Sequence, residues 1–172
     1  MNAELNRRDL LKAVTVAFTA LQLPAAEPNA PLFFTKHEFA LLDTLTELVV
    51  PKDQHSPGAH DAGVARYIDR TVAESFLPED KTSWRDGLAA IDELSQFMFE
   101  MPFLKTTKQQ QIALLSKIAA NENHPQTPAE KFFTQLKQTT AFVYYSSAVG
   151  IHQEINYKGN VILDQFVGYD AV

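Results

Sequence analysis

The strongest constraint on the fold is a series of helix start signals, each followed by apolar residues at helical spacing. In the segment 35–51, Thr35 is followed three residues later by Glu38, which is the pattern of a capping box. Apolar residues then recur at steps of three and four along one face, and Pro51 ends the segment. The residues of this face are Phe39, Leu42, Leu45, Leu48 and Val49. The pattern predicts an amphipathic helix that buries one side.

Four later segments follow the same rule. Apolar spacing predicts helices over about residues 62–75 and 83–99, separated by a break at 76–83. Thr107 with Gln110 marks another start, and Thr127, Pro128 and Glu130 mark a helix that runs to residue 149, before Gly150. No alternating run is long enough to require a sheet. The sequence therefore predicts an all-α fold, a single bundle of about five helices with an irregular C-terminal segment.

The N-terminal residues have the pattern of a twin-arginine export signal. In the stretch NRRDLLK, Arg7 and Arg8 precede Leu10, Leu11 and Lys12. The apolar run that follows, residues 13–23, is too short for a membrane span, which needs about 20 residues. An amphipathic helix with an accidental arginine pair is the alternative. We divide the chain into a twin-arginine signal peptide at 1–26 and a helical domain at 27–172.

Composition excludes several classes of partner and cofactor. The chain has 15 Lys and Arg against 21 Asp and Glu, so its net charge of −6 argues against a nucleic-acid partner. It has no cysteine, which excludes disulfides, thiolate metal sites and iron–sulfur clusters. None of its six glycines forms a GxGxxG or P-loop pattern, so no flavin or nucleotide site is indicated. We assign no catalytic, cofactor-binding or metal-binding residue to this chain.

One loop leaves an alternative open. His55 and His60 flank the sequence Ser-Pro-Gly-Ala, and together with Asp53 and Asp61 they could hold a divalent metal. A solvated polar loop explains the same residues, because the spacing matches no metal motif. The alternative function is thus a free-standing periplasmic helical protein that binds a metal or a small ligand.

Aromatic residues are abundant, with 12 Phe, five Tyr and one Trp. Pairs such as Phe132 with Phe133, and Phe97 close to Phe99, put more aromatic surface on a helix than one face can bury. Such a surplus is typical of a subunit with a large partner interface, since aromatic residues dominate interface anchors. A core rich in Phe would give the same composition.

Two segments resemble the gluconate 2-dehydrogenase subunit 3 family. The segment 45–72, LTELVVPKDQHSPGAHDAGVARYIDRTV, is similar to the family pattern of an apolar helix, a V-P step, a polar loop, P-G-A, A-G-V and an aromatic-Ile-Asp. The segment 144–160, YYSSAVGIHQEINYKGN, is similar to a second block that ends in Y-x-G-N. The candidate partner-contact or structural residues in these blocks are Pro57, Gly58, Ala59, Gly63, Tyr67, Asp69, Tyr157, Gly159 and Asn160.

The resemblance implies a small, non-catalytic subunit of a periplasmic dehydrogenase that is membrane-associated through its complex. FAD would be bound by a large partner subunit of the glucose–methanol–choline type, and haem c by a third, cytochrome subunit where present. The twin-arginine translocase would export the chain together with its folded partner. A dedicated assembly chaperone is a variant of the same hypothesis.

Each glycine of the two blocks is expected to have a different structural function. Gly58 is expected to adopt a positive φ at the end of its loop, and Gly63 to let a neighbouring segment approach the start of a helix. Gly159 and Asn160 are expected to form a tight turn after Tyr157.

Overall fold

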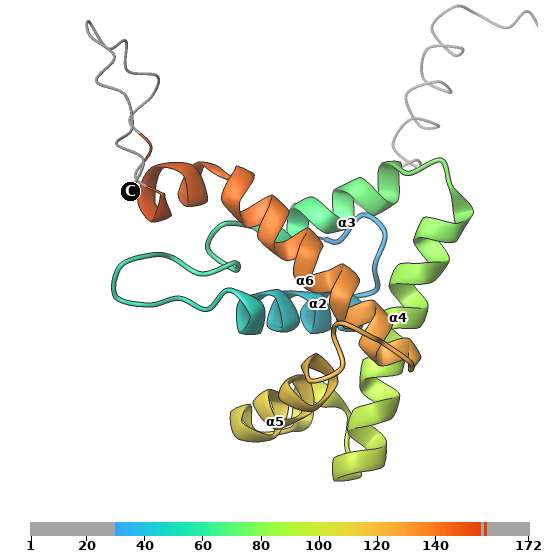
Figure 1. Ribbon diagram of the computed structural model, residues 1–172. Helices are drawn as coiled ribbons and strands as arrows, with labels where there is room; N and C mark the ends of the chain where they lie inside the picture. Colours follow the sequence, from blue (N-terminus) through green and yellow to red (C-terminus); the bar gives the residue numbers. More distant parts are fainter. Residues whose placement is uncertain (1–29, 156, 158–172) are drawn as a thin grey trace, which may run out of the picture. The chain divides into compact units, whose positions relative to one another are not determined.

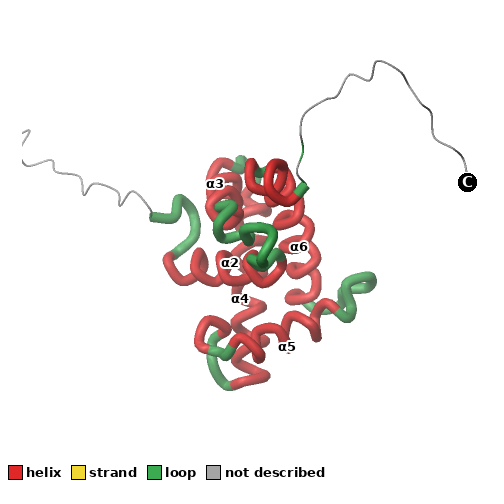
Figure 2. Tube along the Cα trace, turned by 90° about the vertical axis from the view of Figure 1, so that its left-hand side faces the viewer, coloured by secondary structure: helices red, strands yellow, loops and turns green. Residues whose placement is uncertain are grey.

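A computed structural model describes residues 30–155 and 157, and these residues form helices and loops without a strand (Figures 1 and 2). The α-helices of this part are α2 (Lys36–Val49), α3 (Val64–Glu74), α4 (Pro78–Phe99), α5 (Lys108–Ala119) and α6 (Pro128–Ser146). A 3-10 turn, η1 (Phe103–Lys105), precedes α5, and a π-helical turn, η2 (Gly150–Glu154), follows α6. The predicted all-α bundle of about five helices is confirmed. The predicted signal at 1–26 and the turn at Gly159 and Asn160 lie outside the described residues.

The three predicted capping boxes are present. At α2, the Thr35 hydroxyl accepts from the Glu38 N–H at 3.2 Å, and the Glu38 carboxylate accepts from the Thr35 N–H at 2.7 Å. Thr107 starts α5 and Thr127 starts α6 in the same reciprocal way. Each box gives a hydrogen-bond acceptor to two N–H groups that a helix start otherwise leaves without a partner. These three helix starts are therefore determined by residues close together in the sequence.

Two predicted helix boundaries are wrong. The structure starts α4 at Pro78, inside the predicted break, because proline needs no N–H at the first helical position and Glu79 and Asp80 suit the positive end of the helix dipole. It ends α6 at Ser146, before the predicted stop at Gly150.

The end of α6 has a local cause. The Ser147 hydroxyl donates to the Tyr144 carbonyl at 2.6 Å and accepts from the Gly150 N–H at 3.0 Å. These bonds offer the backbone an alternative to the next helical turn. Gly150 is buried there and is the first residue of η2. A glycine is required at this position, because a side chain would meet the backbone of Tyr144 and Tyr145.

The helix α6 is the centre of the packing. It contacts α2, α3, α4, α5 and η2, and in Figure 1 it runs across the other helices. Because α6 is covered from several sides, both Phe132 and Phe133 are buried, although they are adjacent in the sequence. In α5, Leu114 is buried, whereas Ile112 is 47% exposed.

The only tryptophan packs between two buried phenylalanines of the core. Trp84 of α4 lies edge-on between Phe34 and Phe132, with ring centroids 6.5 and 5.6 Å away. On the same helix Gly87 faces the Phe132 ring so closely that any Cβ would overlap it. This contact fixes how close α4 and α6 approach each other. Within the described residues, no helix is both long and apolar enough to cross a membrane.

Candidate functional site

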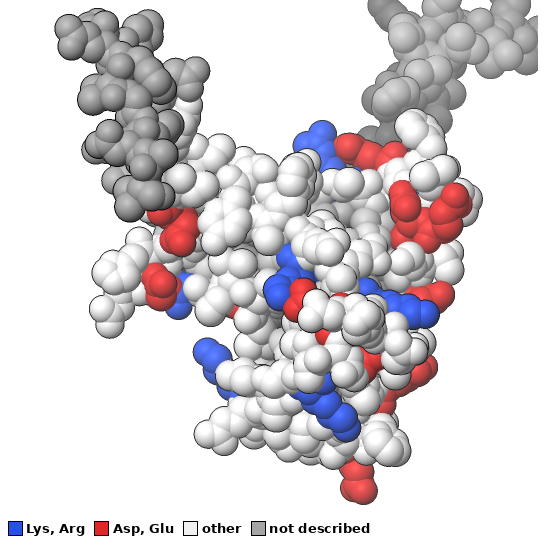
Figure 3. All heavy atoms as spheres, viewed as in Figure 1, with Lys and Arg blue, Asp and Glu red and all other residues white. Residues whose placement is uncertain are grey.

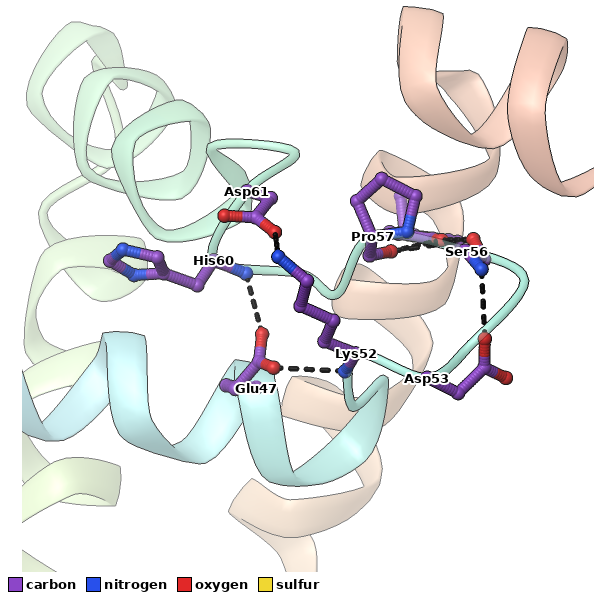
Figure 4. Close-up of polar contacts among 8 residues, drawn as sticks. Glu47, Lys52, Asp53, Ser56, Pro57, His60 and Asp61 are labelled. Atoms are coloured by element: carbon purple, nitrogen blue, oxygen red, sulfur yellow. Dashed lines mark hydrogen bonds and ion pairs between the residues drawn. The ribbon is translucent and has the colours of Figure 1, made fainter.

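The loop between α2 and α3, residues 50–63, is the middle of the first sequence block and is bound by a carboxylate of α2. Glu47 accepts from the Lys52 N–H at 2.9 Å with one oxygen and from the His60 N–H at 2.8 Å with the other (Figure 4). A single side chain therefore joins the beginning of the loop, at Lys52, to its end, at His60. Hydrogen bonds to a carboxylate are among the stronger ones in proteins, so this clamp makes the loop a defined surface.

The two glycines of the loop have the opposite functions to those expected. Gly58 has no positive φ; it is buried, and a Cβ there would meet both carboxylate oxygens of Glu47 and the Lys52 nitrogen. Gly63 has open space where a Cβ would be, but its φ is +69°, and it serves as the N-cap of α3. Close approach is thus required at Gly58 and the left-handed conformation at Gly63.

The structure brings the two sequence blocks together at Tyr144 of α6. The Tyr144 hydroxyl donates to the Pro57 carbonyl at 2.6 Å, and the Ser56 hydroxyl lies 2.6 Å from it. Because a phenol has one proton, Ser56 is then the donor to Tyr144. Tyr144 is 1% exposed; its bond with Ser56 is buried and its bond to Pro57 is partly buried. The second block therefore holds the loop of the first block through the Tyr144 side chain.

The candidate metal ligands of the loop do not converge. The His60 imidazole is bound to Asp43 at 2.7 Å, Asp61 is paired with Lys52 at 2.9 Å, and Asp53 accepts from the His55 and Ser56 N–H groups. The bond and the charge of Asp43 raise the pKa of His60, which stabilises its protonated form and disfavours metal ligation. Figure 4 shows Asp53 and His60 on different sides of the loop. Among the residues the structure describes, no group of three His, Asp or Glu could hold an ion.

A groove of about 670 Å³ lies beside the loop, between α2 and the start of α5. Leu48 and Ile112 form its apolar wall, and both also line a smaller hollow of about 240 Å³ that continues toward α6. The acidic and imidazole groups on its rim are engaged: Glu47 clamps the loop and Asp43 binds His60. The groove is thus an open surface with mixed charge.

Asp69, from the aromatic-Ile-Asp element, is a buried structural residue. Its carboxylate is 0% exposed and accepts three backbone N–H bonds, from Leu32 at 2.6 Å and from Phe33 and Phe34 at 3.0 Å each. It thereby attaches the segment before α2 to α3. This segment places the Phe34 ring against Trp84. The sequence placed Asp69 among the partner-contact or structural candidates but did not indicate these three bonds. The available signal was an acidic residue on the apolar face that Ile68 and Val72 share.

The remaining candidate residues divide by exposure. Pro57 and Ala59 belong to the loop interior, and Ala59 is fully buried. Tyr67 on α3 and Tyr157 after η2 are about half exposed, at 54% and 50%. Among the described residues of the two blocks, Ser56, Asp69 and Tyr144 therefore hold the fold through hydrogen bonds, whereas the side chains of Tyr67 and Tyr157 are half exposed.

The fold and the site together define a class: a small all-α domain whose loop at residues 50–63 is held by hydrogen bonds from α2 and α6. Comparison with family models gives the family. The model for gluconate 2-dehydrogenase subunit 3 matches residues 36–161, which includes both blocks, and the chain belongs to this family. No curated protein and no solved structure matches the chain.

Proposed function

We propose that this chain is the non-catalytic small subunit of a periplasmic, membrane-associated, FAD-dependent dehydrogenase of the gluconate 2-dehydrogenase type. The observation that carries the proposal is the family match over residues 36–161, which spans all the helices that the structure describes. The family description names a subunit, so association with other subunits follows from membership. The oxidation chemistry is assigned to a large flavoprotein partner of the glucose–methanol–choline type, with a cytochrome c subunit as electron acceptor where one is present.

The described chemistry of this chain supports a structural function. Its carboxylates and tyrosine at the site are used as internal hydrogen-bond partners: Glu47 and Asp69 bind backbone N–H groups, and Tyr144 binds the loop. A group that is committed to backbone N–H bonds is a poor proton donor or acceptor for a substrate. These residues instead produce a preformed rigid surface, which lowers the entropy cost of binding a partner.

Export completes the proposal. The twin-arginine pathway carries folded proteins, and a flavoprotein that folds around FAD in the cytoplasm can cross with a partner that supplies the signal. The stretch NRRDLLK at residues 6–12 would serve both chains. The small subunit would thus aid the folding, stability and co-export of the large one.

The export function is tested with a signal variant in the native host. Arg7→Lys combined with Arg8→Lys should leave dehydrogenase activity in the cytoplasm and remove it from the periplasm and membranes, measured with an artificial electron acceptor. Lys12→Arg, a charge-preserving change in the same stretch, is the matched control and should export normally. Normal periplasmic activity with both arginines replaced would contradict the proposal.

A further inference from the structure

The C-terminal part of α6 and the segment that follows it, up to residue 153, contain no charged residue. Residues 138–153 contain no Lys, Arg, Asp or Glu, although such residues make up 21% of the chain. Four exposed residues of this stretch follow helical spacing, and we call them the α6 outer face: Gln138, Phe142, Tyr145 and Ser146. In Figure 3 the surface over the C-terminal half of α6 is white, and charged side chains begin at its margins.

The fold explains the inner side of the same helix but not the outer one. Thr140, Val143 and Tyr144 are buried, and Tyr144 binds the loop of residues 50–63. Phe142 is 68% exposed and Tyr145 46% exposed. Single exposed apolar residues are normal in soluble proteins, but neighbouring aromatic residues in an uncharged surrounding mark an interaction surface.

Two other exposed phenylalanines show the difference. Phe97 of α4 is 83% exposed, yet Glu93 and Glu100 lie one helical turn away on either side. Phe76 is fully exposed at the turn before α4, where Glu79 and Asp80 follow closely. Charged residues are depleted from the cores of interfaces, so these two positions are less suited to become buried.

The α6 outer face is also held rigidly. The Tyr145 ring packs edge-on against Tyr144, with centroids 5.3 Å apart, and Tyr144 is fixed by its two hydrogen bonds. Rigid aromatic residues lose little conformational freedom on binding, which favours them as anchors.

We propose that the α6 outer face is the docking surface for the large flavoprotein subunit, which presents an uncharged apolar patch to Phe142 and Tyr145. This inference rests on the proposed function for the identity of the partner. A lipid surface fits less well, because anionic headgroups attract Lys and Arg and this face has none. A partner that stays bound through export needs a durable contact, and such interfaces have apolar cores.

The test uses the full chain, tagged and co-expressed with the large subunit in the native host. Flavin recovered per mole of tagged chain is measured over a dilution series for the wild type, Phe142→Asp, Tyr145→Asp and the matched control Phe97→Asp. Loss of an interface anchor weakens binding by about tenfold or more. We expect that loss for the first two variants and wild-type recovery for the control, with unchanged circular dichroism for all of them.

A second measurement covers the case in which a variant fails to fold. A photo-reactive benzophenone amino acid at position 142 should cross-link to the large subunit in the purified complex. Cross-linking to a second copy of the chain, binding of the chain alone to anionic vesicles through this face, or wild-type flavin recovery with Phe142→Asp would overturn the inference. Those results leave the proposed function standing if the wild-type chain recovers flavoprotein; a wild-type chain that recovers none contradicts both.

Discussion

Replacing Asp69 by Asn is the sharpest test of how the domain is held together. The side chain is fully buried, and its two oxygens accept three backbone N–H bonds from residues 32–34. Asp69→Asn keeps the shape but replaces one oxygen by an NH₂ group. Because the amide oxygen can still accept from Phe33 and Phe34, the change places a donor opposite the Leu32 N–H.

The size of the effect follows from these contacts. A hydrogen bond to a charged acceptor contributes about 1.5–3 kcal/mol, and a donor left without a partner in the interior costs about 1–3 kcal/mol. We therefore expect Asp69→Asn to lower the free energy of unfolding by about 2–3 kcal/mol, and Asp69→Ala, which removes all three bonds, by about 3–5 kcal/mol. Either change is a large share of a total stability of about 5–15 kcal/mol.

The single tryptophan provides the assay. Trp84 contacts Phe34, the last residue that Asp69 holds, so its fluorescence reports both global unfolding in urea and release of this segment. Asp53→Asn is the matched control, because Asp53 also accepts two backbone N–H bonds but is exposed to water. An Asp69→Asn variant that is no less stable than Asp53→Asn would refute the reasoning.

Three further changes test separate parts of the structure by urea unfolding. Tyr144→Phe removes the hydroxyl that joins α6 to Ser56 and should cost about 1–3 kcal/mol, whereas Tyr145→Phe should be nearly neutral. Gly63→Ala forces a non-glycine residue into φ +69° and should cost about 1 kcal/mol, and an unchanged midpoint would contradict the stated function of this glycine. Hydrogen bonds from Asn121 and from backbone N–H groups lower the pKa of Glu130 from 4.5 to about 2. Its stabilising effect is then complete above pH 4.5 and is lost as the pH falls toward 2, so Glu130→Gln should flatten the acid side of the stability profile.

The helix starts could be predicted because their signals are local. The boxes at Thr35, Thr107 and Thr127 each lie within four residues, and each is present in the structure. The start of α4 and the end of α6 were misplaced. Pro78 follows Leu77, which gives no side-chain cap, so it lacks the capping box that identified Pro128 as a helix start. The two bonds of Ser147 that end α6 have no counterpart in a sequence pattern.

The candidate site was harder to predict from the sequence, because its contacts join residues that are far apart along the chain. Tyr144 and Ser56 are 88 positions apart, and Asp69 lies 37 positions from Leu32. No local pattern indicates which carboxylate clamps a loop, so Glu47 was missed. The glycines Gly58 and Gly63 were recognised as special, but the sequence does not distinguish a position of close approach from one with a left-handed φ.

The central claim is that this chain is a subunit of a flavoprotein dehydrogenase. It is tested most directly by isolating the tagged chain from native periplasm and membranes and measuring flavin absorbance, subunit stoichiometry and oxidation of gluconate or an aldose with an artificial acceptor. We predict a yellow, active complex with one large flavoprotein per chain. A complex that is complete before export and lacks this chain afterwards would make the chain an assembly chaperone. A colourless, inactive and monomeric chain would contradict the account.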